Sequence, residues 1–316
     1  SPPQMHCGPA GGDADVAAWI LVFVLSGIAS PMLLTQIRYD FAPPAASLWP
    51  LLPYYLGTLL AGARAPPLSR AAWGRASQLF SLDVAGQLLT NLGLVTIGPP
   101  LYSIFYKSVT VFTGLLSVVC LPPASHPTRS QWMGMLVITS GLSIGCADAL
   151  QHFSASELWG ALLVIVGCAF FAGAAVASEL FLGPGSKCLG PSEAAWAIGV
   201  EGLVAWTLWA VVGRHALPGS VGFWVLMLAM VGSNALHQAA WFLLVGRVGA
   251  CTTAVLKAMQ SVCLFAAASI AFCGRDSMEC LTWAKAMSFG VVMAGVCIYS
   301  FQTSKGPALD SREREQ

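Results

Sequence analysis

The chain alternates between long apolar runs and short breaks rich in proline, glycine and charged residues. A helix that spans a membrane needs about 20 mainly apolar residues. Proline inside such a helix is tolerated where neighbouring helices satisfy the freed carbonyls, so Pro31 and Pro53 predict kinks. The pattern predicts an all-α membrane protein with about ten transmembrane helices. The predicted spans are 16–37, 45–62, 79–97, 100–121, 131–150, 157–182, 192–213, 221–245, 248–272 and 281–302.

Composition supports the same class of protein. Hydrophobic residues make up 56% of the chain and charged residues 9%, and the mean hydropathy is +0.72. Soluble domains carry about 25% charged residues, so a soluble fold is excluded. The net charge of +1 gives no reason to expect a nucleic-acid partner. The chain has no P-loop, HExxH, GxSxG or dinucleotide motif in a suitable context. We therefore expect no enzymatic activity, no ATP-driven pumping, no cofactor and no metal.

Orientation follows from the lysines and arginines between the predicted spans, because cytoplasmic loops carry an excess of them. With the N-terminus inside, the inner side holds nine such residues and the outer side three. We expect both termini to face the cytoplasm, and we expect segments 1–15 and 303–316 to be disordered. The inner set is Arg64, Arg70, Arg75, Arg129, Lys187, Arg247, Lys305, Arg312 and Arg314, and the outer set is Arg38, Arg214 and Arg275.

An internal repeat emerges when the chain is aligned with itself at an offset of 150 residues. The tight turn TIGPPLYS then falls beside GRVGACTT, and a tryptophan follows each copy, at Trp132 and Trp283. The two copies are offset by five predicted helices. Because five is an odd number, the copies insert into the membrane in opposite senses. This predicts two inverted five-helix repeats, at 16–150 and 151–302, with a substrate site near the midplane. The aligned pairs are Gln87 with His237, Leu94 with Leu244, and Lys107 with Lys257.

Four stretches carry a resemblance to a known family: LDVAGQLLTNLGLVTIGPPLYSIFYKSVTVFTGLLSV, AIGVEGLVAW, SNALHQAAWF and TTAVLKAMQSV. The chain resembles the drug/metabolite transporter superfamily in its nucleotide-sugar-transporter-like branch, in particular the F-type members of solute carrier family thirty-five. The resemblance implies ten helices in two inverted halves and solute exchange or uniport across an internal membrane, such as Golgi, endoplasmic reticulum, lysosome, vacuole or plastid.

Two positions depart from the F-type pattern. Those members tend to carry arginine at the position of Lys107 and an acidic residue at the position of Lys257. One lysine in each half is instead similar to the plastid phosphate translocators and some nucleotide-sugar carriers, in which the equivalent lysines hold phosphate. The resemblance thus implies a small-molecule substrate that contains phosphate.

The two lysines lie within apolar segments, where an ionisable side chain costs several kcal/mol and by default faces the bundle interior. Two ammonium groups that face one cavity require a negative group between them, either a protein carboxylate or an anionic substrate. The alternative is that each lysine extends to an interface. Polar residues follow both lysines at helical spacing, and two tyrosines could stack on a nucleobase or sugar. The predicted substrate-binding residues are Lys107, Lys257, Tyr102, Tyr106, Thr110, Asn91, Gln260 and Asn234.

Carboxylates and one histidine within the predicted spans are candidate charge partners or proton carriers. Asp83, Gln87 and Asn91 share one helical face by their spacing. Glu201 falls near mid-depth, whereas Glu179 falls near the end of its span, where an interfacial role is the alternative. His237 can titrate near neutral pH, or it can simply form a hydrogen bond with a neighbour. The candidates are therefore Asp83, Glu201, Glu179 and His237.

Three functions fit these features. The leading hypothesis is a secondary transporter that exchanges an organic anion, a nucleotide sugar or an organophosphate, by alternating access. The second is a proton-coupled exporter of cationic metabolites, drugs or peptides on the same fold. The third is a membrane scaffold without transport. The expected partners are the lipid bilayer and a small solute, and the chain could act as a monomer or a homodimer. Cys273 and Cys280 could form a loop disulfide or remain two free thiols.

Overall fold

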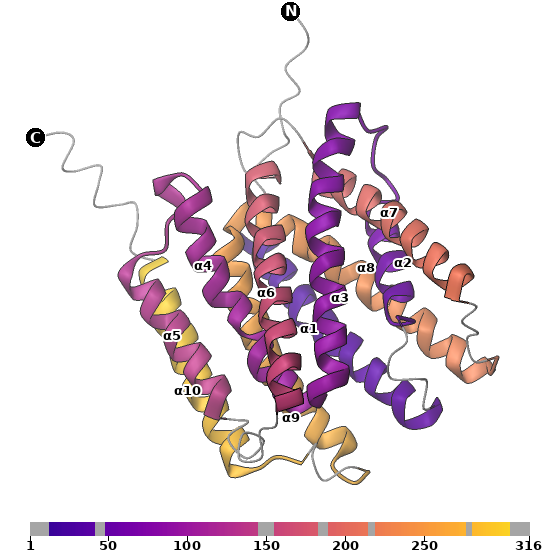
Figure 1. Ribbon diagram of the computed structural model, residues 1–316. Coiled ribbons are helices and arrows are strands. Elements are labelled where there is room, and N and C mark those ends of the chain that lie inside the picture. Colours follow the sequence, from indigo (N-terminus) through magenta and orange to yellow (C-terminus); the bar gives the residue numbers. More distant parts are fainter. Residues whose placement is uncertain are drawn as a thin grey trace, which may run out of the picture.

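A computed structural model describes residues 13–41, 48–144, 155–182, 189–213, 219–275 and 280–303. Within these ranges the chain forms α-helices and one short 3-10 turn, Pro123–Ser125, and contains no strand, as predicted. Residues 1–12 and 304–316 of the predicted tails lie outside the described residues, whereas residues 13–15 and Thr303, which were predicted to be disordered, are helical. Five of the loop cations (Lys187, Arg214, Lys305, Arg312 and Arg314) also lie outside the described residues. The helices are α1 (Asp13–Phe41), α2 (Leu51–Ala61), α3 (Arg70–Tyr106), α4 (Ser108–Cys120), α5 (Arg129–Ile144), α6 (Ala155–Leu182), α7 (Pro191–Gly213), α8 (Val221–Val248), α9 (Ala250–Phe272) and α10 (Trp283–Thr303) (Figure 1).

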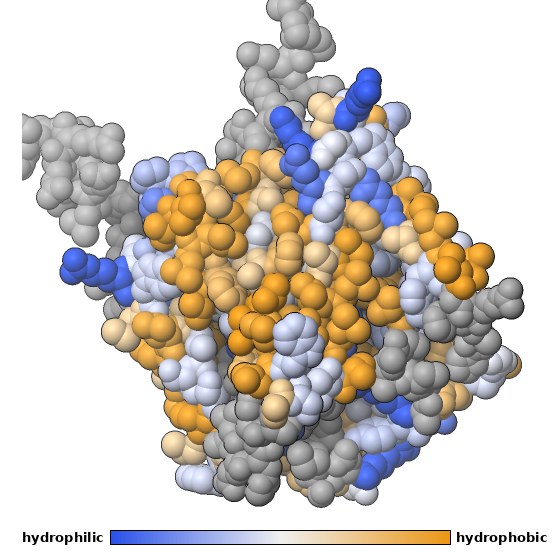
Figure 2. All heavy atoms as spheres, in the orientation of Figure 1, coloured by the Kyte–Doolittle hydropathy of each residue, from blue (hydrophilic) through white to orange (hydrophobic). Residues whose placement is uncertain are grey.

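Seven of the described helices contain a stretch long and apolar enough to cross a membrane: α1, α3, α6, α7, α8, α9 and α10. Large hydrophobic side chains also lie on the outside of the bundle; Val212 is 81% exposed and Ile270 is 89% exposed. Figure 2 shows hydrophobic residues over the middle of the visible face, with the most hydrophilic residues toward its edges. The chain is therefore a multi-pass membrane protein, which confirms the predicted class.

The helices pack in pairs that join early and late parts of the chain. α1 packs with α8, α2 with α7, α3 with α6, α4 with α9, and α5 with α10, the last pair forming one edge of the bundle (Figure 1). Glycines permit close contact: a Cβ atom at Gly134 would lie 2.9 Å from the carbonyl oxygen of Gly295. Small residues at such contacts are typical of membrane helices. The two parts of the chain thus interleave instead of forming separate domains.

The chain reverses direction after Ile97, although helical backbone continues to Tyr106. Ile97 lies against Gly160, near the start of α6. If α3 continued straight from Ile97, its rise of about 1.5 Å per residue would carry Tyr106 about 13 Å past this point and away from the rest of α6. Instead the thiol of Cys168, two turns farther along α6, donates to the carbonyl of Tyr106 at 3.3 Å. The reversal falls at the Gly-Pro-Pro sequence that predicted a break between spans 79–97 and 100–121. Lys107 follows as a single non-helical residue before α4.

The largest extensions beyond the predicted limits are in α1 and α3. α1 was predicted to end at residue 37 but continues to Phe41, so Arg38 is a helical residue and not a loop residue. α3 was predicted to begin at residue 79 but begins at Arg70, after the hydroxyl oxygen of Ser69 accepts the N–H of Ala72 at 3.1 Å. Such side-chain caps stabilise helix starts. A hydropathy pattern marks the apolar part of a helix and misses its polar ends.

The ends of several helices gather on one face, here called the Arg275 face. Phe41 at the end of α1 and Trp49 before α2 both pack on Phe223 at the start of α8, with ring centroids 5.8 Å apart in each pair. The connection from α9 to α10 carries a disulfide between Cys273 and Cys280. The alternative left open by the sequence is therefore resolved in favour of the disulfide.

Candidate binding site

Two adjoining cavities lie inside the bundle, between α1, α3, α6, α8 and α9. The larger has a volume of about 430 Å³ and the smaller about 130 Å³. Four residues line both of them: Tyr54, Gln87, Tyr106 and Lys257. Lys257 therefore stands at the boundary between the two cavities.

The ammonium group of Lys257 is surrounded by aromatic side chains. Its Nζ donates to the hydroxyl of Tyr106 at 2.8 Å and lies 5.1 Å from the centre of that ring. The rings of Phe171 and Trp241 are each 5.8 Å from Nζ. Among the described residues, no carboxylate oxygen lies within 4.0 Å of this ammonium. Cation–π contacts of this kind contribute about 0.5–2 kcal/mol. The rings therefore stabilise the ammonium group without neutralising it, so its positive charge can still attract an anion.

Lys107 follows Tyr106 directly in the sequence and belongs to the other half of the chain from Lys257. The side chain is 6% exposed, its Nζ donates to the hydroxyl of Ser261 on α9, and it lies 5.6 Å from the Tyr106 ring. Both lysines line the larger cavity. The structure thus brings the two lysines that the sequence alignment paired to one cavity, with both ammonium groups near the Tyr106 ring.

The remaining wall of the larger cavity is polar on several helices. Asn234 accepts from the Ser30 hydroxyl at 3.2 Å. Gln260 donates to the carbonyl of Gly27 at 2.6 Å, while its buried Oε1 has no hydrogen-bond partner in the described part of the chain. The rings of Tyr102 and Tyr106 lie 5.3 Å apart. Of the predicted substrate-binding residues, this cavity brings together Lys107, Lys257, Tyr102, Tyr106, Asn91, Gln260 and Asn234.

The larger cavity is cationic and extends toward the Arg275 face. Arg38, Lys107 and Lys257 line it, and none of its described lining residues is Asp or Glu. Its wall includes Pro50, which precedes α2, and Ala268, one turn before the end of α9. Arg38 was not predicted to line a site. The hydropathy pattern placed Arg38 in the loop after the first predicted span, so the sequence offered no signal for it.

The smaller cavity contains a carboxylate. The hydroxyl of Tyr54 donates to Asp83 Oδ1 at 3.0 Å, and that of Tyr55 donates to Oδ2 at 3.3 Å. His237 also lines this cavity and stacks on Phe23 with ring centroids 4.5 Å apart. Its Nδ1 lies 3.2 Å from the Phe23 carbonyl oxygen. Two of the four predicted charge partners, Asp83 and His237, therefore face the same space as Lys257.

Three predicted site residues do not line either cavity. Thr110 is buried in the packing of α4. Glu201 of α7 accepts a hydrogen bond from the Ser77 hydroxyl on α3. Glu179 accepts the N–H of Ala250 at 2.6 Å. Because a helix N-terminus favours negative charge, Glu179 stabilises the start of α9.

The sequence analysis did not select Tyr54, Phe171 or Trp241, which surround the central charges. Phe171 and Trp241 lie on α6 and α8, and each reaches Lys257 only through the packing of three helices. Trp241 follows His237 by four residues and so shares its helical face. That spacing was the one available signal.

Comparison with known proteins places the fold. No family model matches the chain, and no curated protein matches it. Solved structures do match, among them a crystal structure described simply as that of a protein, with a TM-score of 0.72 and 14% identity. The match covers 91% of this chain and 98% of the other. At this identity the likeness shows a shared fold alone.

Proposed function

We propose that the protein is a secondary transporter that binds a small organic anion in the larger cavity. The observation that carries this proposal is that Lys107 and Lys257, from the two halves, line one cavity together with Arg38 and with no Asp or Glu among its described lining residues. Its volume of about 430 Å³ lies within the range of about 300–1,000 Å³ that small-molecule sites occupy. A nucleotide sugar or an organophosphate is the substrate class that this charge favours.

The proposal includes ten spans in two inverted repeats, 16–150 and 151–302, and membership of the drug/metabolite transporter superfamily. Helix packing supports the repeats. An inverted repeat pairs α1 with α6, α2 with α7, α3 with α8, α4 with α9, and α5 with α10 as counterparts. The contact between α1 and α8 is then the counterpart of that between α6 and α3, and both contacts are formed. α2, α4 and α5 each contact their own counterparts, as expected for helices that lie beside a two-fold axis between the halves.

We further propose that both termini are cytoplasmic and that the larger cavity opens to the lumenal or external side in this conformation. The Cys273–Cys280 disulfide supports this orientation, because disulfides persist on the oxidising side of a membrane. An internal membrane is the proposed location. A thiol reagent that cannot cross the membrane should label these cysteines after reduction from the lumenal side alone.

Alternating access would require opening at the opposite face, where packing closes the path. Leu121, Ala175, Val176 and Ala250 form a buried cluster there, adjacent to the Glu179 contact with the Ala250 N–H. Separation of α6 from the start of α9 would open this side. Closure around Arg38 would seal the other. The lysines would stay with the bound anion between these two states.

A second candidate, proton-coupled export of a cationic solute, is favoured by one observation. The smaller cavity combines Asp83 with the rings of Tyr106, Phe171 and Trp241, and carboxylates and aromatic rings are the groups that attract organic cations. In that case Lys257 would be an internal counter-ion of Asp83.

Uptake into proteoliposomes tests the proposal. Labelled uridine diphosphate glucose, glucose 6-phosphate and inorganic phosphate form the anion panel, and tetraethylammonium is the cation. Wild type is compared with Lys107→Gln, Lys257→Gln and Glu201→Gln, the last being a control outside both cavities. We expect anion uptake that both lysine variants lose and the control retains. Uptake of the cation alone would favour the second candidate, and no uptake of any solute by folded protein would favour a scaffold.

A further inference from the structure

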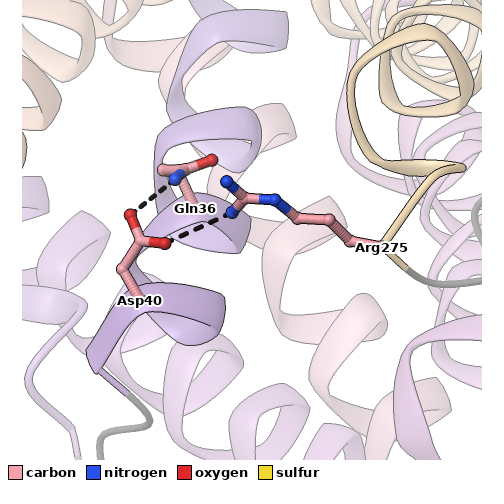
Figure 3. A network of polar contacts seen from close by, with 3 residues as sticks. All are labelled: Gln36, Asp40 and Arg275. Atoms are coloured by element: carbon pink, nitrogen blue, oxygen red, sulfur yellow. Dashed lines mark hydrogen bonds and ion pairs between the residues drawn. The ribbon is translucent and has the colours of Figure 1, made fainter.

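Arg38 differs from the other described arginine on its face. Arg275 donates to Asp40 at 3.2 Å, and Asp40 also accepts from Gln36 at 2.5 Å, so these three residues form a network (Figure 3). No described carboxylate lies within 4.0 Å of the Arg38 guanidinium, which instead lines the larger cavity. Its charge is therefore directed to the cavity and is not used in an ion pair within the described part of the chain.

Arg38 lies at a different depth from the two lysines. Gln260 and Ser261 are on the α9 turn that follows Lys257, Ser261 accepts from Lys107, and Gln260 donates to the carbonyl of Gly27 on α1. Arg38 is eleven residues farther along α1 than Gly27. At a rise of about 1.5 Å per residue, it is displaced by about 16 Å toward the Arg275 face. The cavity thus has a central pair of cations and a third cation at its mouth.

We propose that Arg38 is an entry residue, which draws the anionic substrate into the mouth of the larger cavity before the two lysines bind it. This inference rests on the proposed function and adds a residue to it. A cleft lined by one sign of charge raises the local concentration of a ligand of opposite charge. The effect acts on entry and is screened by salt. It is also confined to one side of the membrane, because only the Arg275 face carries this residue at a cavity mouth.

The test uses full-length protein in uniformly oriented vesicles, with the three labelled anions offered from each side in turn. For the anion that wild type carries, Arg38→Gln should raise KM about three- to tenfold from the Arg275 side at about 20 mM salt, with kcat unchanged. At about 300 mM salt the difference should shrink, because the Debye length falls to several ångströms. Arg38→Lys, which retains the charge, should remain within about twofold of wild type.

Arg247→Gln is the matched control, since Arg247 is an exposed arginine near the end of α8 that lines neither cavity. It should leave KM from the Arg275 side unchanged. An Arg38→Gln protein that matches wild type, that alters kcat equally from both sides, or that is matched by Arg247→Gln would overturn the entry role while leaving the transport function intact. If wild type carries none of the three anions, both the function and the entry role fail.

Discussion

The two cavities share Lys257 but differ in the charges around it. In the larger, Lys257 is joined by Lys107 and Arg38, and no described lining residue is acidic. In the smaller, the same ammonium faces Asp83, whose two oxygens accept hydrogen bonds from Tyr54 and Tyr55. The carboxylate of Asp83 thus lies in the smaller cavity, where it is hydrogen-bonded to two tyrosine hydroxyl groups. An excess of positive charge remains for a solute in the larger one.

The largest expected effect is at Lys257, because it serves both cavities. Lys257→Gln should reduce anion transport at least tenfold, which corresponds to about 1.4 kcal/mol of binding free energy. Lys257→Arg should retain part of the activity, since the charge remains but its geometry changes. Initial rates in proteoliposomes measure both variants, and a thermal unfolding curve checks that each is folded. Wild-type anion rates in a folded Lys257→Gln protein would mean that this lysine has a structural role.

A substitution at Asp83 should distinguish the roles of the two cavities, because we expect it to lower stability more than it lowers anion transport. Asp83→Asn removes the charge that strengthens two hydroxyl hydrogen bonds, and bonds to charged groups contribute about 1.5–3 kcal/mol each. We expect a lower midpoint of thermal unfolding, with anion KM within about threefold of wild type. Ser81→Ala, on an exposed position of the same helix, is the control. A loss of anion transport at unchanged stability would instead assign Asp83 to the transport step.

Two buried glutamines allow a direct comparison of the cavity walls. Gln260 lines the larger cavity and is 7% exposed, and Gln238 lines the smaller and is 6% exposed. Gln260→Leu should weaken anion binding about fivefold, the equivalent of a hydrogen bond worth about 1 kcal/mol. Gln238→Leu should change it less than twofold. Equal effects of both substitutions on the anion KM would argue that the two cavities form one binding site.

The smallest effect is expected at the Asp40–Arg275 pair, because both side chains are substantially exposed. Exposed ion pairs contribute about 0–1 kcal/mol. A double-mutant cycle with Asp40→Asn and Arg275→Gln, measured by thermal unfolding, should therefore give a coupling energy of less than about 1 kcal/mol. A larger value would indicate that the α9–α10 connection is held to α1 more firmly than an exposed pair allows.

The sequence by itself determined the class of protein and most of the helices. Apolar runs of about 20 residues have few alternatives to a spanning helix, because backbone groups in lipid must be satisfied within the segment. The reversal at Gly98–Pro100 was predictable for a similar reason, since consecutive prolines remove backbone donors. The pairing of Lys107 with Lys257 was visible because an internal alignment compares positions without any knowledge of packing.

The tertiary structure decided which side chains meet. That Tyr106, Phe171 and Trp241 all face Lys257 depends on the rotation and depth of α3, α6 and α8 against α9. The helical period places residues on a face of one helix but does not say which neighbour that face contacts. Arg38 shows the same limit: hydropathy assigned it to a loop, whereas its position on an extended α1 brings it to the cavity wall. Contacts between helices arise from the packing of whole surfaces, which the pattern along one segment does not contain.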